Sequence, residues 1–79
     1  MSGIDLIVTR WPKRELSIRR LFTRNADFRA LCEDYGEALR AMRHWQAAGS
    51  EPKAEEFRSL AAEIETEIVR MLDLSPGEP

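Results

Sequence analysis

The chain has 79 residues, a length that allows one domain at most. Its hydrophobic fraction of 43% excludes a chain that is disordered throughout, and its formal net charge of −2 excludes a strong overall attraction to nucleic acid or acidic membranes. A core of this size contributes little stability once the entropy of ordering is subtracted, so we expect self-association.

The first eleven residues form an apolar arm whose pattern fits two structures. The apolar residues of 4–8 alternate as in a strand, whereas those of 4–11 share one face of a helix. No other segment resembles a strand that could pair with them. We therefore expect an arm, in part helical, that packs on the helices, with Trp11 extended because Pro12 follows it.

Residues 12–23 predict a short basic helix that begins at Pro12. Residues 10–24 hold six bases and one acid, whereas residues 51–79 hold eight acids and three bases. The favoured interpretation places the basic helix near the acidic one, within one chain or across a dimer. The alternative is a phosphate-binding helix, and its candidate contacts are Arg14, Arg19, Arg20 and Arg24.

Asn25 allows two interpretations of the next boundary. It can cap a new helix, with Asp27 in the first turn, or it can occupy a seam position in one continuous helix. We favour the helix break over the continuous helix.

Residues 27–48 predict the long helix around which the chain is organised. Its apolar stripe has a four-three spacing and consists of Phe28, Cys32, Tyr35, Leu39 and Met42. Gly36 interrupts this helix, and we interpret it as a tolerated helical glycine in preference to the mark of a close helix crossing. Gly49 is expected to end the helix at the C′ position.

A second long helix is predicted over residues 52–73, after a short connection that Ser50 can cap. Its stripe has the same spacing and consists of Phe57, Ala61, Ile64, Ile68 and Met71. Because the connection is short, the two long helices should be antiparallel neighbours. The predicted organisation is an arm (1–11), a single helical-hairpin domain (12–74) and a frayed tail (75–79).

The residues that often carry chemistry do not form a recognisable site. No paired histidines, metal-binding cysteine pair or glycine-rich phosphate loop occurs, and we expect no metal or cofactor. His44 should be an exposed imidazole, and Cys32 a buried thiol that behaves as a small hydrophobe. Trp11, Tyr35 and Trp45 are expected to be packing residues. We therefore predict a protein that is not an enzyme.

The single cysteine cannot form an internal disulfide, which fits a reducing compartment, although an intermolecular bridge stays possible. The arm lacks the pattern of a signal peptide, and no run of about 18 apolar residues is present to span a membrane. A cytoplasmic location is the expectation.

The spacing of apolar residues from 18 to 72 resembles that of the YdcH-like family of small bacterial proteins. The matching positions are Ile18, Leu21, Asn25, Phe28, Leu31, Tyr35, Leu39, Leu60, Glu67, Ile68, Met71 and Leu72. Family members often have proline after the asparagine, where this chain has Ala26, and the arm is not typical of the family. The resemblance implies a short helical hairpin, possible coiled-coil association and no assigned activity.

The sequence thus predicts an all-α fold, an antiparallel helical hairpin preceded by a short basic helix, which associates as a dimeric bundle. The favoured function is a non-enzymatic protein–protein interaction module that forms a homodimer or binds another protein. The alternative is a nucleic-acid-binding accessory protein that uses residues 10–24. The candidate partner contacts are Trp11, Ile18, Phe22, Trp45 and Phe57.

Overall fold

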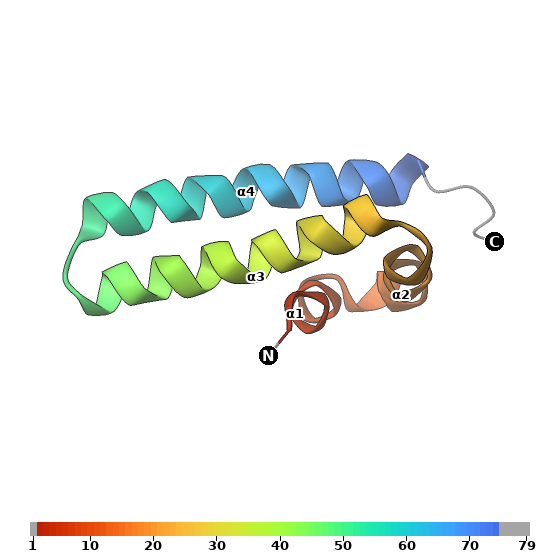
Figure 1. The fold of residues 1–79 in the computed structure, drawn as a ribbon, viewed down its shortest axis with the longest axis horizontal. Coiled ribbons are helices and arrows are strands. Elements are labelled where there is room, and N and C mark those ends of the chain that lie inside the picture. The colour runs from red at the N-terminus through yellow and green to blue at the C-terminus, as the bar shows by residue number, and fades with distance from the viewer. Residues whose placement is uncertain (1, 75–79) are drawn as a thin grey trace.

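The computed structural model describes residues 2–74, and this part of the chain is all-helical, as the sequence predicted (Figure 1). The elements in order are α1 (Gly3–Arg10), the 3-10 helix η1 (Pro12–Arg14), α2 (Glu15–Arg24), α3 (Ala26–Ala47) and α4 (Glu51–Leu74). The helices α3 and α4 lie side by side and run antiparallel, while α1 and α2 pack against the N-terminal half of α3 (Figure 1). The predicted tail, residues 75–79, lies outside the described residues.

The N-terminal arm is helical through most of its length and packs on α3, so its strand interpretation is wrong. Ser2 donates from its backbone N–H and its hydroxyl to the Asp5 carboxylate, at 3.3 and 2.8 Å, and these bonds lower the pKa of Asp5. An isolated helix of eight residues is not stable in water. Packing must therefore hold α1 in place, and its Ile7 is 0% exposed.

The chain turns between α1 and α2 at Trp11, where the backbone leaves the helical region with φ −129° and ψ 69°. Pro12 follows at the first position of η1, and a residue that precedes proline is disfavoured in the helical conformation. Trp11 is thus outside both the helical and the extended regions, so the predicted extended conformation is wrong. The segment after it does begin at Pro12, but as the 3-10 helix η1, and the α-helix α2 begins only at Glu15.

Asn25 separates α2 from α3, so the continuous helix is wrong and the favoured break is confirmed. Its backbone is extended, and its Oδ1 accepts a hydrogen bond from the Phe28 N–H at 3.0 Å. Arg29 stabilises the other side of the break because its Nη1 donates to the carbonyl oxygen of Phe22, at 2.6 Å, in the last turn of α2. Carbonyls at the end of a helix lack intrahelical partners, so one arginine joins the two helices at this corner.

The connection between α3 and α4 is a compact C-terminal cap. Gly49 has φ +80°, its N–H donates to Gln46 at 3.1 Å, and the Ser50 N–H donates to Trp45 at 2.9 Å, both to carbonyl oxygens. This pair of bonds defines a Schellman motif, and it places Gly49 at C′ as predicted. α4 begins directly afterwards, so the turn is short enough to bring the two helices together.

The core receives side chains from every α-helix of the described residues. The buried cluster consists of Ile7, Ile18, Phe28, Cys32, Tyr35, Ala38, Ala61, Ile64, Ile68 and Leu72. It includes the buried members of both predicted stripes. Because α1 and α2 cover only the N-terminal half of α3, the end of the α3–α4 pair near Gly49 consists of two helices alone (Figure 1).

The prediction that Gly36 is an ordinary, tolerated helical glycine is wrong, because Gly36 lies at a close crossing of α1 and α3. It is buried, and a Cβ placed on it would lie 3.3 Å from the Cα of Gly3 in α1. A Cβ on Gly3 would lie 1.9 Å from the carbonyl oxygen of Cys32. The two glycines therefore let the backbones of α1 and α3 approach more closely than other residues allow.

Candidate functional site: a groove between α3 and α4

An open hollow made of two adjoining parts lies between α3 and α4. We call it the α3–α4 groove. Its two parts have volumes of about 460 and about 420 Å³ and share Asp34 as a lining residue. The lining residues are Asp27, Ala30, Leu31, Asp34, Glu37, Ala38 and Ala41 of α3, and Phe57, Leu60, Ile64, Glu67, Arg70 and Met71 of α4. No residue of α1 or α2 is among them, so the groove lies on a face that these helices leave open.

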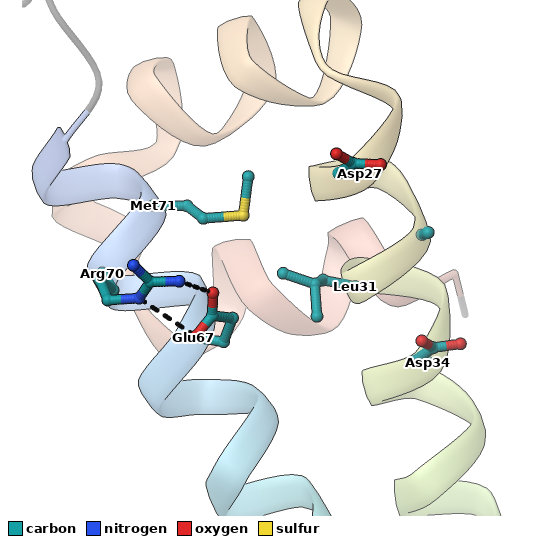
Figure 2. Close-up of a pocket in the computed structure, with 7 residues that line it drawn as sticks. Asp27, Leu31, Asp34, Glu67, Arg70 and Met71 are labelled. Carbon is teal, nitrogen blue, oxygen red and sulfur yellow. Dashed lines mark hydrogen bonds and ion pairs between the residues drawn. The ribbon is translucent and has the colours of Figure 1, made fainter.

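Apolar side chains form the floor of the groove. In Figure 2, Leu31 of α3 and Met71 of α4 point toward each other across the gap between the helices. Ala38 and Ile64 are buried, Phe57 is partly buried, and Leu60 is 43% exposed at the edge. On the α3 side, the small side chains of Ala30, Ala38 and Ala41 leave the groove open. The floor is thus a strip of apolar surface that runs along both helices.

Carboxylates surround this floor. We call Asp27, Asp34, Glu37 and Glu67 the acidic rim; with Arg70 as the one base, the lining carries a net charge of −3. Arg70 pairs with Glu67, and its Nε donates to that carboxylate at 3.2 Å (Figure 2). The other three carboxylates belong to α3, and no hydrogen bond or ion pair within residues 2–74 engages their side chains.

Phe57 is the one predicted partner contact that lines the groove. Ile18 is 0% exposed, so we assign it to the core. Phe22 is partly buried beneath the guanidinium of Arg29, whose central carbon lies 5.7 Å from the ring centroid. Trp11 lies on the α1 side of α4, where it borders a shallow hollow with Ala62 and Val69.

Trp45 lies near the turn that joins α3 and α4, and it is partly buried. The ammonium of Lys53 lies 5.5 Å from its ring centroid, and the ring of His44 packs edge-on at 5.0 Å. His44 is exposed, as predicted. This arrangement ties the start of α4 to the end of α3 by a cation–π contact.

The basic residues contribute ion pairs within the chain. Arg14 lies 2.9 Å from Asp73 of α4, and Arg10 lies 3.5 Å from Glu65 of the same helix. The favoured interpretation of the charge pattern is therefore confirmed for these two pairs within one chain. Arg19 pairs with Glu15 at 2.8 Å, and both Arg20 and Arg24 are exposed on α2.

Two groups that can act as nucleophiles lie in the core. Burial and the nearby Glu33 raise the pKa of Cys32 to about 12, so its thiol stays protonated at neutral pH. Burial, and then the hydrogen bond that its hydroxyl donates to Glu65 at 2.5 Å, raise the pKa of Tyr35 to about 12. The same Glu65 oxygen lies near Arg10, so this cluster joins α1, α3 and α4.

Within residues 2–74, no three side chains of the histidine, cysteine or carboxylate type gather closely enough to hold a metal ion. None of the helices in that range has the length and apolar composition needed to cross a membrane. A scan of protein-family models, a search of curated proteins and a search of solved structures each found no match. The groove must therefore be interpreted from its own chemistry.

Sequence reasoning identified the stripes but missed the groove. Leu31 and Leu60 stand beside the four-three rows, and they line the groove together with the stripe members Phe57, Ile64 and Met71. The sequence feature that could have indicated the groove is the width of each apolar stripe, because a helix that packs against a single neighbour needs only a narrow stripe. The position of α1 then decides which part of the stripe stays open, and the local pattern contains no information about that position.

Proposed function

We propose that this protein is a non-enzymatic interaction module that binds an amphipathic helix of another chain in the α3–α4 groove. The observation that carries the proposal is the apolar floor, which runs along both helices and which no other element of the described chain covers. A helix laid between two neighbouring helices packs its side-chain ridges into the groove between them. Such binding uses apolar anchors one turn apart.

The floor offers places for such anchors at both ends. Leu31 and Met71 form one end, and Phe57 and Leu60 border the other. Burial of a leucine side chain is worth about 1.5–3 kcal/mol, so covering the exposed 43% of Leu60 contributes about 1 kcal/mol. Several such contributions are needed before the cost of association is offset.

A non-enzymatic role is supported by the state of the two buried nucleophiles. Cys32 and Tyr35 are both packed in the core, and both keep their protons at neutral pH because burial raises the pKa of each. An activated nucleophile needs access to the substrate, and in addition a lowered pKa or an adjacent base. The Tyr35 hydroxyl has a carboxylate beside it, Glu65, but the side chain is only 4% exposed, and Cys32 is 0% exposed. These two side chains therefore serve packing in the proposed module.

The docked helix belongs either to a second copy of this chain or to a different protein. The homodimer expected from the small core stays a prediction, and light scattering at low micromolar concentration tests it. A particle with the mass of one chain, under conditions in which the groove binds a helix, would remove the homodimer from the proposal.

The decisive experiment is an NMR titration of the whole protein with a neutral amphipathic peptide of leucine and glutamine, about 18 residues long and thus about 27 Å as a helix. We expect chemical shift changes that centre on Leu31, Leu60 and Met71. Leu60→Gln should weaken binding, whereas Leu16→Gln, the same change at a leucine 61% exposed on α2, should not. Changes confined to α1 and α2, or no binding, would contradict the proposal.

A further inference from the structure

We propose that the helix recognised by the α3–α4 groove is amphipathic and basic, and that it belongs to a different protein. This inference rests on the proposed function, and it adds the charge of the partner. The observation that carries it is the acidic rim, which gives the lining a net charge of −3 on a chain whose formal charge is −2. The groove lining thus carries more negative charge than the whole chain.

The rim carboxylates are placed along the groove, beside the position that a docked helix would take. Asp27, Asp34 and Glu37 are separated by seven and three residues, so they share one side of α3 and extend over about 15 Å along it. Exposed Glu56 and Glu63 lie one turn to either side of Leu60 on α4. Lysine or arginine side chains that flank the anchors of a docked helix would therefore meet carboxylates along both helices.

The same charges argue against a second copy of this chain that docks through the same face. A two-fold contact places each acidic rim against its counterpart, and like charges that face each other suppress association. The concentration of basic residues lies instead on α2 and the residues before it.

The basic helix α2 of a second copy also does not fit the groove. Its Ile18 is 0% exposed because it packs in the core of its own chain. The large apolar side chain that α2 leaves exposed is Leu16, at 61%. A helix that docks in a groove needs several anchors at spacings of three, four and seven residues. The occupant is therefore a basic amphipathic segment from another protein.

The test compares three labelled peptides with the same leucine positions, in which the flanking positions are all lysine, all glutamine or all glutamate. Fluorescence anisotropy with the whole protein measures their affinities at about 50 and about 300 mM NaCl. We expect the lysine peptide to bind at least about tenfold more tightly than the glutamine peptide at low salt, and the glutamate peptide to bind most weakly. Higher salt should reduce the advantage of the lysine peptide.

A matched pair of variants locates the effect. Asp34→Asn with Glu37→Gln removes two rim carboxylates and should weaken the lysine peptide about threefold to tenfold, with little change for the glutamine peptide. Glu33→Gln with Glu55→Gln makes the same change in net charge at exposed residues that do not line the groove, and it should leave both affinities unchanged. Equal weakening by both double variants would mean nonspecific attraction and would overturn the inference.

The outcomes separate this inference from the proposed function. If all three peptides bind equally and Leu60→Gln weakens each of them, the groove binds helices but the partner is not basic. If no peptide binds, or if binding is insensitive to Leu60→Gln, the proposed function itself fails. Binding of the lysine peptide that depends on both Leu60 and the rim carboxylates supports the two together.

Discussion

Gly3→Ala is the substitution that most directly tests how α1 is held against α3. A Cβ at this position would lie 1.9 Å from the carbonyl oxygen of Cys32 and 2.5 Å from its carbonyl carbon. Both atoms belong to the α3 backbone, so no side-chain rotation can relieve the overlap. Because a nonbonded carbon and oxygen need more than 3.0 Å, we expect the N-terminus of α1 to move away by more than about 1 Å.

The cost follows from the contacts that this movement weakens. A gap of about 0.5–1 Å removes a quarter to a half of the dispersion energy between packed atoms. Ile7 is 0% exposed, and complete burial of an isoleucine is worth about 1.5–3 kcal/mol. The partly buried Ile4 and Val8 add smaller losses. We therefore expect the free energy of unfolding to fall by about 2 kcal/mol, a large share of the total of about 4–12 kcal/mol for a chain of this length.

Gly36→Ala provides the matched control on the opposite side of the same crossing. Its Cβ would lie 3.3 Å from the Cα of Gly3 and 3.4 Å from Nη1 of Arg40, and the Arg40 side chain can move. Alanine within a helix gains about 1 kcal/mol over glycine, and this gain offsets a displacement of α1 by a few tenths of an ångström. We expect stability within about 1 kcal/mol of the unchanged protein.

Urea denaturation followed by tryptophan fluorescence gives the free energies, and hydrogen exchange at the amides of α1 shows whether the helix stays docked. The expected pattern is a clear loss of stability and of α1 protection for Gly3→Ala, with neither change for Gly36→Ala. If Gly3→Ala kept both the stability and the protection of the unchanged protein, the close crossing described above would be refuted.

Three further predictions concern single interactions and are measured by denaturation. Asn25→Ala should lower the free energy of unfolding by about 1 kcal/mol because it removes the side-chain cap of α3. Asn25→Asp should lose much less, because the aspartate side chain can accept the same hydrogen bond. Folding raises the pKa of Tyr35 from 10.0 to about 12, so the protonated hydroxyl adds to the free energy of unfolding below pH 10, and this addition is lost as the pH rises toward 12. Tyr35→Phe, which also removes the hydrogen bond to Glu65, should therefore make the free energy of unfolding fall less steeply over that pH range. A double-mutant cycle on Arg14 and Asp73 should give a coupling of at most about 1 kcal/mol, since the pair is on the surface.

Features set by local chemistry were predicted well from the sequence. Asn25 caps α3, Gly49 ends it in a Schellman motif, and Pro12 begins the segment after α1, because each depends on backbone groups only a few residues away. The proximity of basic and acidic segments was also predicted, since composition alone indicates which charges are in excess. These signals gave the order of the helices and where each turn between them lies.

Features that depend on distant segments were not accessible in the same way. Gly36 looked like an ordinary helical glycine because its partner at the crossing, Gly3, is far away in the sequence. The arm was too short for its periodicity to distinguish a helix from a strand, and only packing through Ile7 settles the choice. The local pattern shows how much apolar surface a helix has, and it does not show which neighbour covers which part.

The groove illustrates how the covered and open parts of α3 differ in composition. The side toward α1 has the small residues Cys32 and Gly36 at its centre, where the backbones of α1 and α3 come close together. The open side has alanines next to Asp34 and Glu37, so it combines a low apolar floor with exposed carboxylates. A face used only to contact water gains nothing from an apolar strip at its centre, and a face meant for another copy gains nothing from a rim of like charge. An occupant with apolar anchors and basic flanks satisfies both features, which is why the peptide comparison varies only the flanking charge.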